Sequence, residues 1–441
     1  MALQLWCAGP RSGGRGDICG IGSMLNTARH SELAQRTGLP ADWYADGLVW
    51  PDYAGSGLFN LAVSLARACG ADVPANYADL ALTGGIAASG NWDTADTLVF
   101  FLIDGLGDAF LSRNREIAPA LWRDRVQSLT SVFPSTTATA ITTLMTAEPA
   151  AVHGLLGWYV RDEETGSVVA PLPMRHRGGV AVDDADLLAR LLQTAPMLQT
   201  ARRDSRFVTL PELANGPYSR HHRRSASVNA YETLDSLAWS VFRADREMTE
   251  SGSQQKFIYA YSPLLDATGH DFGMESQQSR DVLARLDHAY AQMRHLLPEA
   301  QFVVSADHGF IDNPAEKQIV LSDHPDLYSM LRGPLTGERR VAYCHVKPEC
   351  QTTFGLRVAE RFGDCLHAMP AALAFDAGLF GPGEGVNALQ RGGDWLLIPR
   401  DDWTVLDNVA GEQGHDMRGV HGGLSAGEMD VPLILSPSAR A

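Results

Sequence analysis

The chain has 441 residues, 45% of them hydrophobic and 20% charged, so it can bury a large core and wholesale disorder is excluded. Acidic residues number 52 against 36 Lys and Arg, and the net charge of −16 argues against binding to nucleic-acid polymers or anionic membrane surfaces. There is no apolar run of about 18 residues and no apolar leader segment, so we expect no membrane span and a cytoplasmic location.

Several common motifs are excluded. The six cysteines form no Cys-x-x-Cys pair, which argues against a zinc ribbon, and no lysine lies in a Gly-Lys-Ser/Thr phosphate loop. Gly105-Leu106-Gly107 follows an apolar run, but Phe110 occupies the third glycine position of a dinucleotide fingerprint. Ser425 lies in a Gly-x-Ser-x-Gly pattern, yet no histidine follows it, as a nucleophile elbow would require.

The secondary-structure pattern predicts strands that alternate with helices. Strands separated by helices are typical of an α/β fold with a doubly wound, mostly parallel sheet, in which sites gather at the carboxyl ends of the strands. We expect strands at Thr97–Asp104, Phe257–Tyr261, Gln301–Ala306 and Val431–Leu435, and helices near Leu33–Thr37, Gly57–Cys69 and Ser276–Leu297.

Composition along the chain suggests four segments. Residues 1–95 form an N-terminal helical lead-in, 96–311 the α/β core, 312–410 an inserted α+β cap, and 411–441 a C-terminal return to the core. The cap is predicted because alternating stretches, such as 340–347 and 394–399, lie there between turns rich in glycine and proline.

Carboxylates and imidazoles follow the predicted strands. Each piece alone is compatible with surface polar residues or helix caps, but together they offer three oxygen and three nitrogen donors. Such a mixture suits Zn²⁺, or less tightly Mn²⁺ or Fe²⁺, and six ligands are too many for one tetrahedral ion, so we expect two ions. The candidate ligands are Asp104, Asp266, His270, Asp307, His308 and His421.

A hydroxyl nucleophile could come from Phe133-Pro134-Ser135-Thr136-Thr137, at a predicted helix start. The free N–H groups and the positive dipole end of such a helix favour a phosphoryl group. Taken alone, the segment also fits an ordinary Ser/Thr-rich helix cap.

In combination these motifs resemble the alkaline phosphatase superfamily, and most of all its type I phosphodiesterase/nucleotide pyrophosphatase group. The resemblance rests on Asp104, FPSTTATAITTLMTAEPAAVHG, Asp266-x-x-x-His270, Asp307-His308-Gly309 and His421-Gly422-Gly423, and spans about 97–435. It implies an alkaline phosphatase-like three-layer sandwich and a two-zinc hydrolase of phosphate esters.

The resemblance also implies residue roles. Thr137 would be the catalytic nucleophile and form a phosphothreonine, with Thr136 as the fallback. One zinc would be held by Asp266, His270 and His421, and the other by Asp104, Asp307, His308 and Thr137. Zinc is expected, and manganese is possible.

One departure concerns the substrate. Where nucleotide pyrophosphatases commonly carry an asparagine that touches the phosphate, this chain has Trp158, followed by Tyr159; both could bind an aromatic group of a small phosphate ester. The motifs contain no lysine, and Arg418 is the only arginine within three residues of a proposed ligand, so a singly charged diester is expected to be preferred over a dianionic monoester.

Alternatives stay open. The chain could be a phosphomonoesterase or a metal-dependent phosphomutase of the same superfamily, although phosphomutases use serine where Thr137 stands here. It could also be a binding or regulatory member without turnover. The oligomeric state is not predicted.

Overall fold

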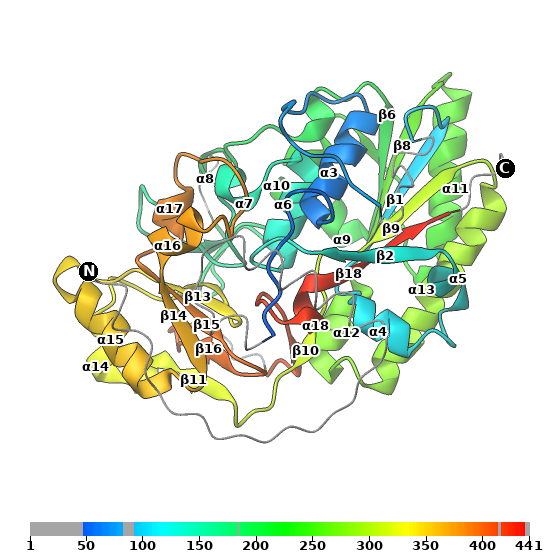
Figure 1. Cartoon of the computed structure of the whole chain (residues 1–441). Coiled ribbons are helices and arrows are strands. Elements are labelled where there is room, and N and C mark those ends of the chain that lie inside the picture. The colour runs from blue at the N-terminus through cyan, green and yellow to red at the C-terminus, as the bar shows by residue number, and fades with distance from the viewer. Residues whose placement is uncertain (1–46, 83–91, 183, 185, 413–415, 437–441) are drawn as a thin grey trace.

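The computed structural model describes residues 47–82, 92–182, 184, 186–412 and 416–436; the helix expected near 33–37 lies outside this part of the chain. Its largest sheet has seven strands in the order β2-β18-β9-β1-β8-β6-β7 (Figure 1). Their bounds are Arg125–Thr130 for β2, Asp430–Leu435 for β18, Gln301–Ser305 for β9, Thr97–Ile103 for β1, Lys256–Ser262 for β8, Asp204–Val208 for β6 and Ser227–Val228 for β7.

The five strands from β9 to β7 are parallel, whereas β18 runs antiparallel to both β9 and β2. The predicted doubly wound, mostly parallel sheet is therefore confirmed, with β18 as the exception. Because β18 is reversed, its first residues lie at the edge where the parallel strands end. The chain that leads into β18 is thus brought to the same edge as the carboxyl ends of β1, β8 and β9.

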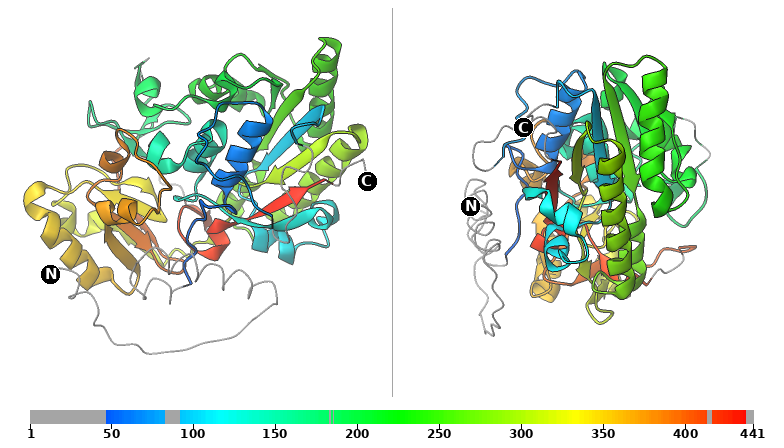
Figure 2. Two further views of the ribbon diagram at one scale, coloured as in Figure 1. Left: turned by 45° about the horizontal axis from the view of Figure 1, so that its top comes forward. Right: turned by 90° about the vertical axis from the view of Figure 1, so that its right-hand side faces the viewer.

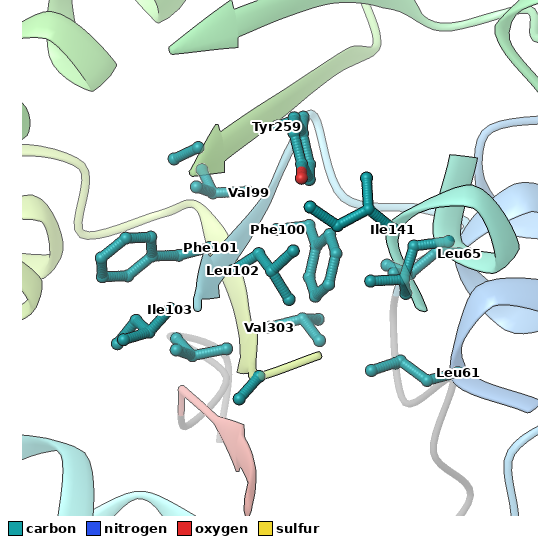
Figure 3. Close-up of a cluster of buried hydrophobic side chains, with 14 of the residues drawn as sticks. Leu61, Leu65, Val99, Phe100, Phe101, Leu102, Ile103, Ile141, Tyr259 and Val303 are labelled. Atoms are coloured by element: carbon teal, nitrogen blue, oxygen red, sulfur yellow. The ribbon is translucent and has the colours of Figure 1, made fainter. Parts of the chain in front are cut away.

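Helices cover both faces of the sheet, as the three-layer expectation requires (Figures 1 and 2). Every residue of β1 is buried, which explains its unbroken apolar sequence. Phe100 points toward Ile141 and Leu65 on one side, and Phe101 points the other way (Figure 3). On the first side lie α3 (Leu58–Ala68) and α6 (Thr137–Thr146); on the other lie α11 (Leu234–Glu250) and α13 (Gln277–Leu296).

Two of these helices match predicted ones closely. The side chain of Ser276 caps α13 by accepting a hydrogen bond from the Ser279 N–H at 3.1 Å. Helix α3 is buried at ten of its eleven positions, only Arg67 being partly exposed, so it belongs to the main core and is more than a lead-in.

The cap is a second, smaller body that the chain forms between β9 and β18. Its entry and exit are paired, because β10 (Ile311–Asp312) and β17 (Gly419–Val420) form an antiparallel ladder. Inside it, a four-stranded antiparallel sheet has the order β12-β13-β15-β14, and α15 and α16 pack beside β14. The bounds are Thr336–Glu338 for β12, Val341–Cys344 for β13, Trp395–Pro399 for β15, Leu366–Pro370 for β14, Gln351–Phe362 for α15 and Ala371–Asp376 for α16.

A segment of the core portion also joins the cap. The small sheet of β3 (Val160–Arg161), β4 (Val168–Ala170) and β5 (Arg175–His176) is linked to β12 through Tyr159 and Gly337, whose backbones exchange hydrogen bonds of 2.7 and 3.2 Å. None of the helices in the described ranges combines the length and the apolar character that a membrane crossing needs.

Candidate metal centre

All six predicted ligands lie at the carboxyl edge of the large sheet. Asp104 directly follows β1, and Asp307 and His308 follow β9. Asp266 and His270 lie one helical turn apart on α12 (Leu264–Phe272), which begins just after β8, so both side chains point from one face of that helix. His421 directly follows β17 and is brought to this edge by the reversed direction of β18.

Three of the donor atoms form one tight set. The Oδ1 atom of Asp266 lies 3.4 Å from Nε2 of His270 and 3.6 Å from Nε2 of His421. The two imidazole Nε2 atoms are 3.3 Å apart. These three residues are those predicted to hold one ion.

A second set surrounds His308. Its Nε2 atom lies 3.3 Å from both Asp104 Oδ1 and Asp307 Oδ2, and 3.1 Å from the hydroxyl of Thr137. The His308 ring also stacks on His421 with centroids 3.6 Å apart, and its Nε2 lies 3.9 Å from Asp266 Oδ1. His308 therefore stands between the two sets, and its donor atom is within reach of either.

The carboxylates leave one oxygen each without a hydrogen bond. The atoms Asp104 Oδ1, Asp266 Oδ1 and Asp307 Oδ2 are buried and have no partner. The second carboxylate oxygen is hydrogen-bonded in two of the three residues. Asp104 Oδ2 accepts from the Tyr261 hydroxyl, and Asp307 Oδ1 accepts from the N–H groups of Gly105 and His308 at 3.1 and 3.0 Å. Buried acceptors of this kind are costly unless a cation meets them, so the donor set fits bound divalent metal.

The three imidazoles are oriented by backbone carbonyls. Their Nδ1 atoms lie 2.9 Å from Gly419 O for His270, 3.0 Å from Gly309 O for His308 and 3.3 Å from Ser135 O for His421. A carbonyl oxygen can only accept, so each Nδ1 carries the proton. Each Nε2 atom then faces the carboxylates, and once it is unprotonated its lone pair is free to bind metal, which is the arrangement of metal-ligating histidines.

The pKa values show how strongly these groups depend on positive charge. Burial and the neighbouring Asp104 raise the pKa of Asp307 well above its usual range, and raise that of Asp266. Burial would lower the pKa of His308, but the carboxylates of Asp307 and Asp104 raise it to about 10. In His421, burial and the nearby imidazoles lower the pKa. A cluster in which acids retain protons and one imidazole is charged exchanges those protons for metal.

The predicted nucleophile lies at the start of α6. Thr136 is the N-cap residue, but its hydroxyl makes no capping bond and donates instead to Glu338 Oε1 at 2.6 Å. The first-turn N–H groups of α6 are therefore not capped by it, and the positive end of the helix dipole lies at Thr137, beside His308. Thr137 is 8% exposed and lies beside His308, whereas Thr136 is fully buried.

Of the two aromatic residues predicted to bind substrate, Tyr159 already makes side-chain contacts within the protein. Tyr159 donates its hydroxyl to Glu412 at 2.7 Å, and Arg177 lies over its ring at 4.7 Å. Trp158 contributes its backbone N–H, which donates to Glu338 Oε1 at 2.6 Å. Both side chains are partly exposed, and their role in substrate binding stays a prediction. Nothing in the sequence pointed to Glu338, which β12 of the cap brings to this site from 202 positions beyond Thr136.

A carboxylate–imidazole centre beside a helix-start hydroxyl, at the carboxyl edge of a mostly parallel sheet, defines a class of metal-dependent hydrolases of phosphate esters. A family model for type I phosphodiesterase/nucleotide pyrophosphatase matches residues 98–424. The chain belongs to this family and is a phosphoester-hydrolysing enzyme. The family is metal-dependent, and the groups described above provide candidate ligands.

Solved structures agree on the fold. Phosphonoacetate hydrolase from Sinorhizobium meliloti 1021 is 19% identical, with a TM-score of 0.56 over 78% of this chain and 92% of its own. Murine ectonucleotide pyrophosphatase/phosphodiesterase 5 is 17% identical, with a TM-score of 0.57 over 76% and 87%. The human protein of that name is 15% identical, with a TM-score of 0.57 over 77% and 87%. No curated protein sequence matches the chain.

Proposed function

We propose that the protein is a two-metal phosphodiesterase, loaded with zinc or alternatively manganese, in which Thr137 is transiently phosphorylated. The observation that carries this proposal is the position of the Thr137 hydroxyl. It lies 3.1 Å from Nε2 of His308, the residue between the two ligand sets, and at the N-terminus of α6.

The chain's own groups then have distinct tasks. Asp266, His270 and His421 would hold one ion, and Asp104, Asp307 and His308 the other. When bound, such ions polarise a phosphoryl oxygen and favour the ionised form of a hydroxyl or water. The open amides at the start of α6 bind the phosphoryl oxygens. Thr137 Oγ1 attacks phosphorus and displaces the alcohol, and water then hydrolyses the phosphothreonine from the opposite side.

Thr137 is a better nucleophile than Thr136 in this arrangement. The hydroxyl of Thr136 is fully buried and already donates to Glu338, so it can reach neither a substrate nor the ligand sets without breaking that bond. An inactive threonine-to-alanine variant of the murine phosphodiesterase 5 was solved in complex with AMP, with 17% identity and a TM-score of 0.55 to this chain. A threonine whose replacement leaves that neighbour inactive supports a catalytic role for Thr137 here.

The charge of the site supports a diester substrate. Arg418, the only arginine near a ligand in sequence, is exposed. Arg340 is buried but committed to Glu428, to which it donates two hydrogen bonds of 3.0 Å. A singly charged diester therefore costs less to desolvate at this site than a dianionic monoester.

The nucleophile is tested by comparing Thr137→Ala with Thr136→Ala in zinc-loaded protein. Thr137→Ala should lower kcat on an aryl phosphodiester by about a thousandfold or more, with metal content near two ions per chain. Thr136→Ala should be far milder. A larger loss for Thr136→Ala would move the nucleophile to that residue, and fewer than one zinc per wild-type chain by elemental analysis would overturn the two-metal proposal.

The substrate class is tested on one preparation with an aryl phosphodiester and the corresponding monoester. The diester should have the higher kcat/KM. A tenfold preference for the monoester, about 1.4 kcal/mol in transition-state stabilisation, would make the protein a phosphatase. Absence of turnover with either ester, despite full metal loading, would refute the proposed diesterase activity.

A further inference from the structure

Glu338 is an acidic side chain beside the metal centre, and its two carboxylate oxygens have different surroundings. Its Oε1 atom accepts hydrogen bonds from the Thr136 hydroxyl and the Trp158 N–H, both at 2.6 Å. Its Oε2 atom takes no hydrogen bond from any residue in the described ranges, and the side chain is partly exposed. The carboxylate is thus fixed through one oxygen and open to an incoming group through the other.

The neighbours of Glu338 place it beside the phosphoryl group. Thr136 directly precedes the proposed nucleophile, and Gly422, which follows the ligand His421, approaches Glu338 so closely that a Cβ there would lie 2.9 Å from Glu338 Cβ. In an in-line displacement the leaving alcohol departs on the side opposite Thr137. Through Thr136, Glu338 is held on the Thr137 side of phosphorus, where its neighbours are the anionic phosphoryl oxygens, which a carboxylate repels, and the ester group that remains on phosphorus.

Charge determines which retained group suits this position. Two divalent cations are offset in charge by the three aspartate ligands and Glu338. The guanidinium of Arg339 next to Glu338 interacts more strongly with Glu412 and Asp416 than with Glu338. A diester with a neutral retained alcohol adds a further negative charge beside the Glu338 carboxylate, whereas a retained alcohol with an ammonium group adds none. Burial raises the pKa of Glu338 to about 7, so the side chain is mostly ionised at mildly alkaline pH.

We propose that Glu338 is a specificity-determining residue that selects phosphodiesters whose retained alcohol carries an ammonium group, which donates to Oε2. This inference rests on the proposed phosphodiesterase function. It identifies the substrate class as zwitterionic amino-alcohol diesters.

A matched pair of substrates tests the inference. Para-nitrophenyl aminoethyl phosphate and para-nitrophenyl propyl phosphate release the same alcohol and differ by an ammonium in place of a methyl group. At about pH 8 the wild type should have at least a tenfold higher kcat/KM for the aminoethyl ester. Glu338→Gln keeps an acceptor for Thr136 and Trp158 but loses the charge, so the preference should disappear and the propyl ester should be cleaved faster.

Glu412→Gln is the matched control, because Glu412 is a nearby carboxylate whose charge is already met by Arg177 at 3.0 Å. It should leave the ratio of the two kcat/KM values unchanged. Binding gives a second readout that needs no turnover. In zinc-loaded Thr137→Ala protein, calorimetry should show the aminoethyl ester binding at least tenfold more tightly than the propyl ester. Adding Glu338→Gln should equalise the two dissociation constants.

The outcomes separate the two proposals. Hydrolysis of both esters at similar kcat/KM, with a ratio that Glu338→Gln does not change, would overturn the role of Glu338 and leave the phosphodiesterase standing. If neither ester is cleaved, the function fails, and the calorimetric ratio still decides whether Glu338 recognises the ammonium group. An equal loss of preference in Glu412→Gln would also refute a specific role for Glu338.

Discussion

Replacing Asp307 by asparagine should stabilise the metal-free protein while weakening its response to zinc. Asp307 Oδ2 is buried without a hydrogen-bond partner, next to the equally unpartnered Asp104 Oδ1 and 3.3 Å from Nε2 of His308. An asparagine keeps Oδ1 for the N–H groups of Gly105 and His308, and its amide can donate to Asp104 without the proton uptake that Asp307 needs for the same bond. Giving a buried polar atom a hydrogen-bond partner stabilises the folded protein by about 1–3 kcal/mol. We therefore expect the free energy of unfolding in EDTA to rise by about 2 kcal/mol.

The same change removes a metal ligand. At a free zinc concentration a thousandfold above the dissociation constant, binding stabilises the folded wild type by about 4.1 kcal/mol. If Asp307→Asn weakens zinc binding a hundredfold, the gain at that concentration falls to about 1.4 kcal/mol.

Urea unfolding with EDTA and with buffered zinc measures both quantities, and zinc removal from the wild type should lower its unfolding midpoint. Asp402→Asn is the control, because Asp402 pairs with Lys317 at the surface and should change neither value by more than about 0.5 kcal/mol. A metal-free Asp307→Asn protein that is less stable than the wild type by more than about 1 kcal/mol would refute the reasoning. A zinc-dependent increase in the free energy of unfolding that is as large in Asp307→Asn as in the wild type would refute it too.

Three further predictions concern residues around the site and in the cap. Arg340→Met leaves the buried Glu428 carboxylate unpaired and should cost about 3–5 kcal/mol in urea unfolding, most of it restored by adding Glu428→Gln; a loss below about 1 kcal/mol would contradict this. Burial lowers the pKa of His345 to about 4, below its ordinary 6.5, so the unfolded chain binds the proton more tightly. The contribution of His345 to the unfolding free energy should then fall by about 2.6 kcal/mol as pH drops from 6.5 to 4, and His345→Gln should reduce the overall decline by that amount. Trp158→Ala should raise KM for aryl diesters more than for alkyl diesters. Equal effects on both would contradict an aromatic contact between Trp158 and the substrate.

Much of the fold follows from local patterns. The apolar run at 97–103 becomes a central strand because a parallel strand with helices on both sides has no face for polar residues. Ser276 before a periodic segment marks the start of α13, since its side chain meets a free N–H of the first turn. The direction of β18 has no such signature, because an apolar strand of that length is compatible with either orientation.

The features of the site likewise fall into those that the sequence could predict and those that it could not. Residues next to one another in sequence could be paired in advance: Asp266 with His270 by one helical turn, and Asp307 with His308 by adjacency. The position of His308 between both ligand sets could not be predicted from the sequence, since it depends on the packing of strands from distant segments. The contacts of Tyr159 with Glu412 and Arg177 could not be predicted either.

The amino-acid sequence by itself determined the class of sheet, the ligand types and the hydroxyl at a helix start, because these depend on periodicity and on residue chemistry over a few positions. Only the tertiary structure decided that the hydroxyl of Thr136 is engaged while that of Thr137 faces the ligands, and that a cap strand places Glu338 beside them. Hydrogen bonds between residues some two hundred positions apart leave no local pattern. They arise when the sheet edge and the cap close on each other.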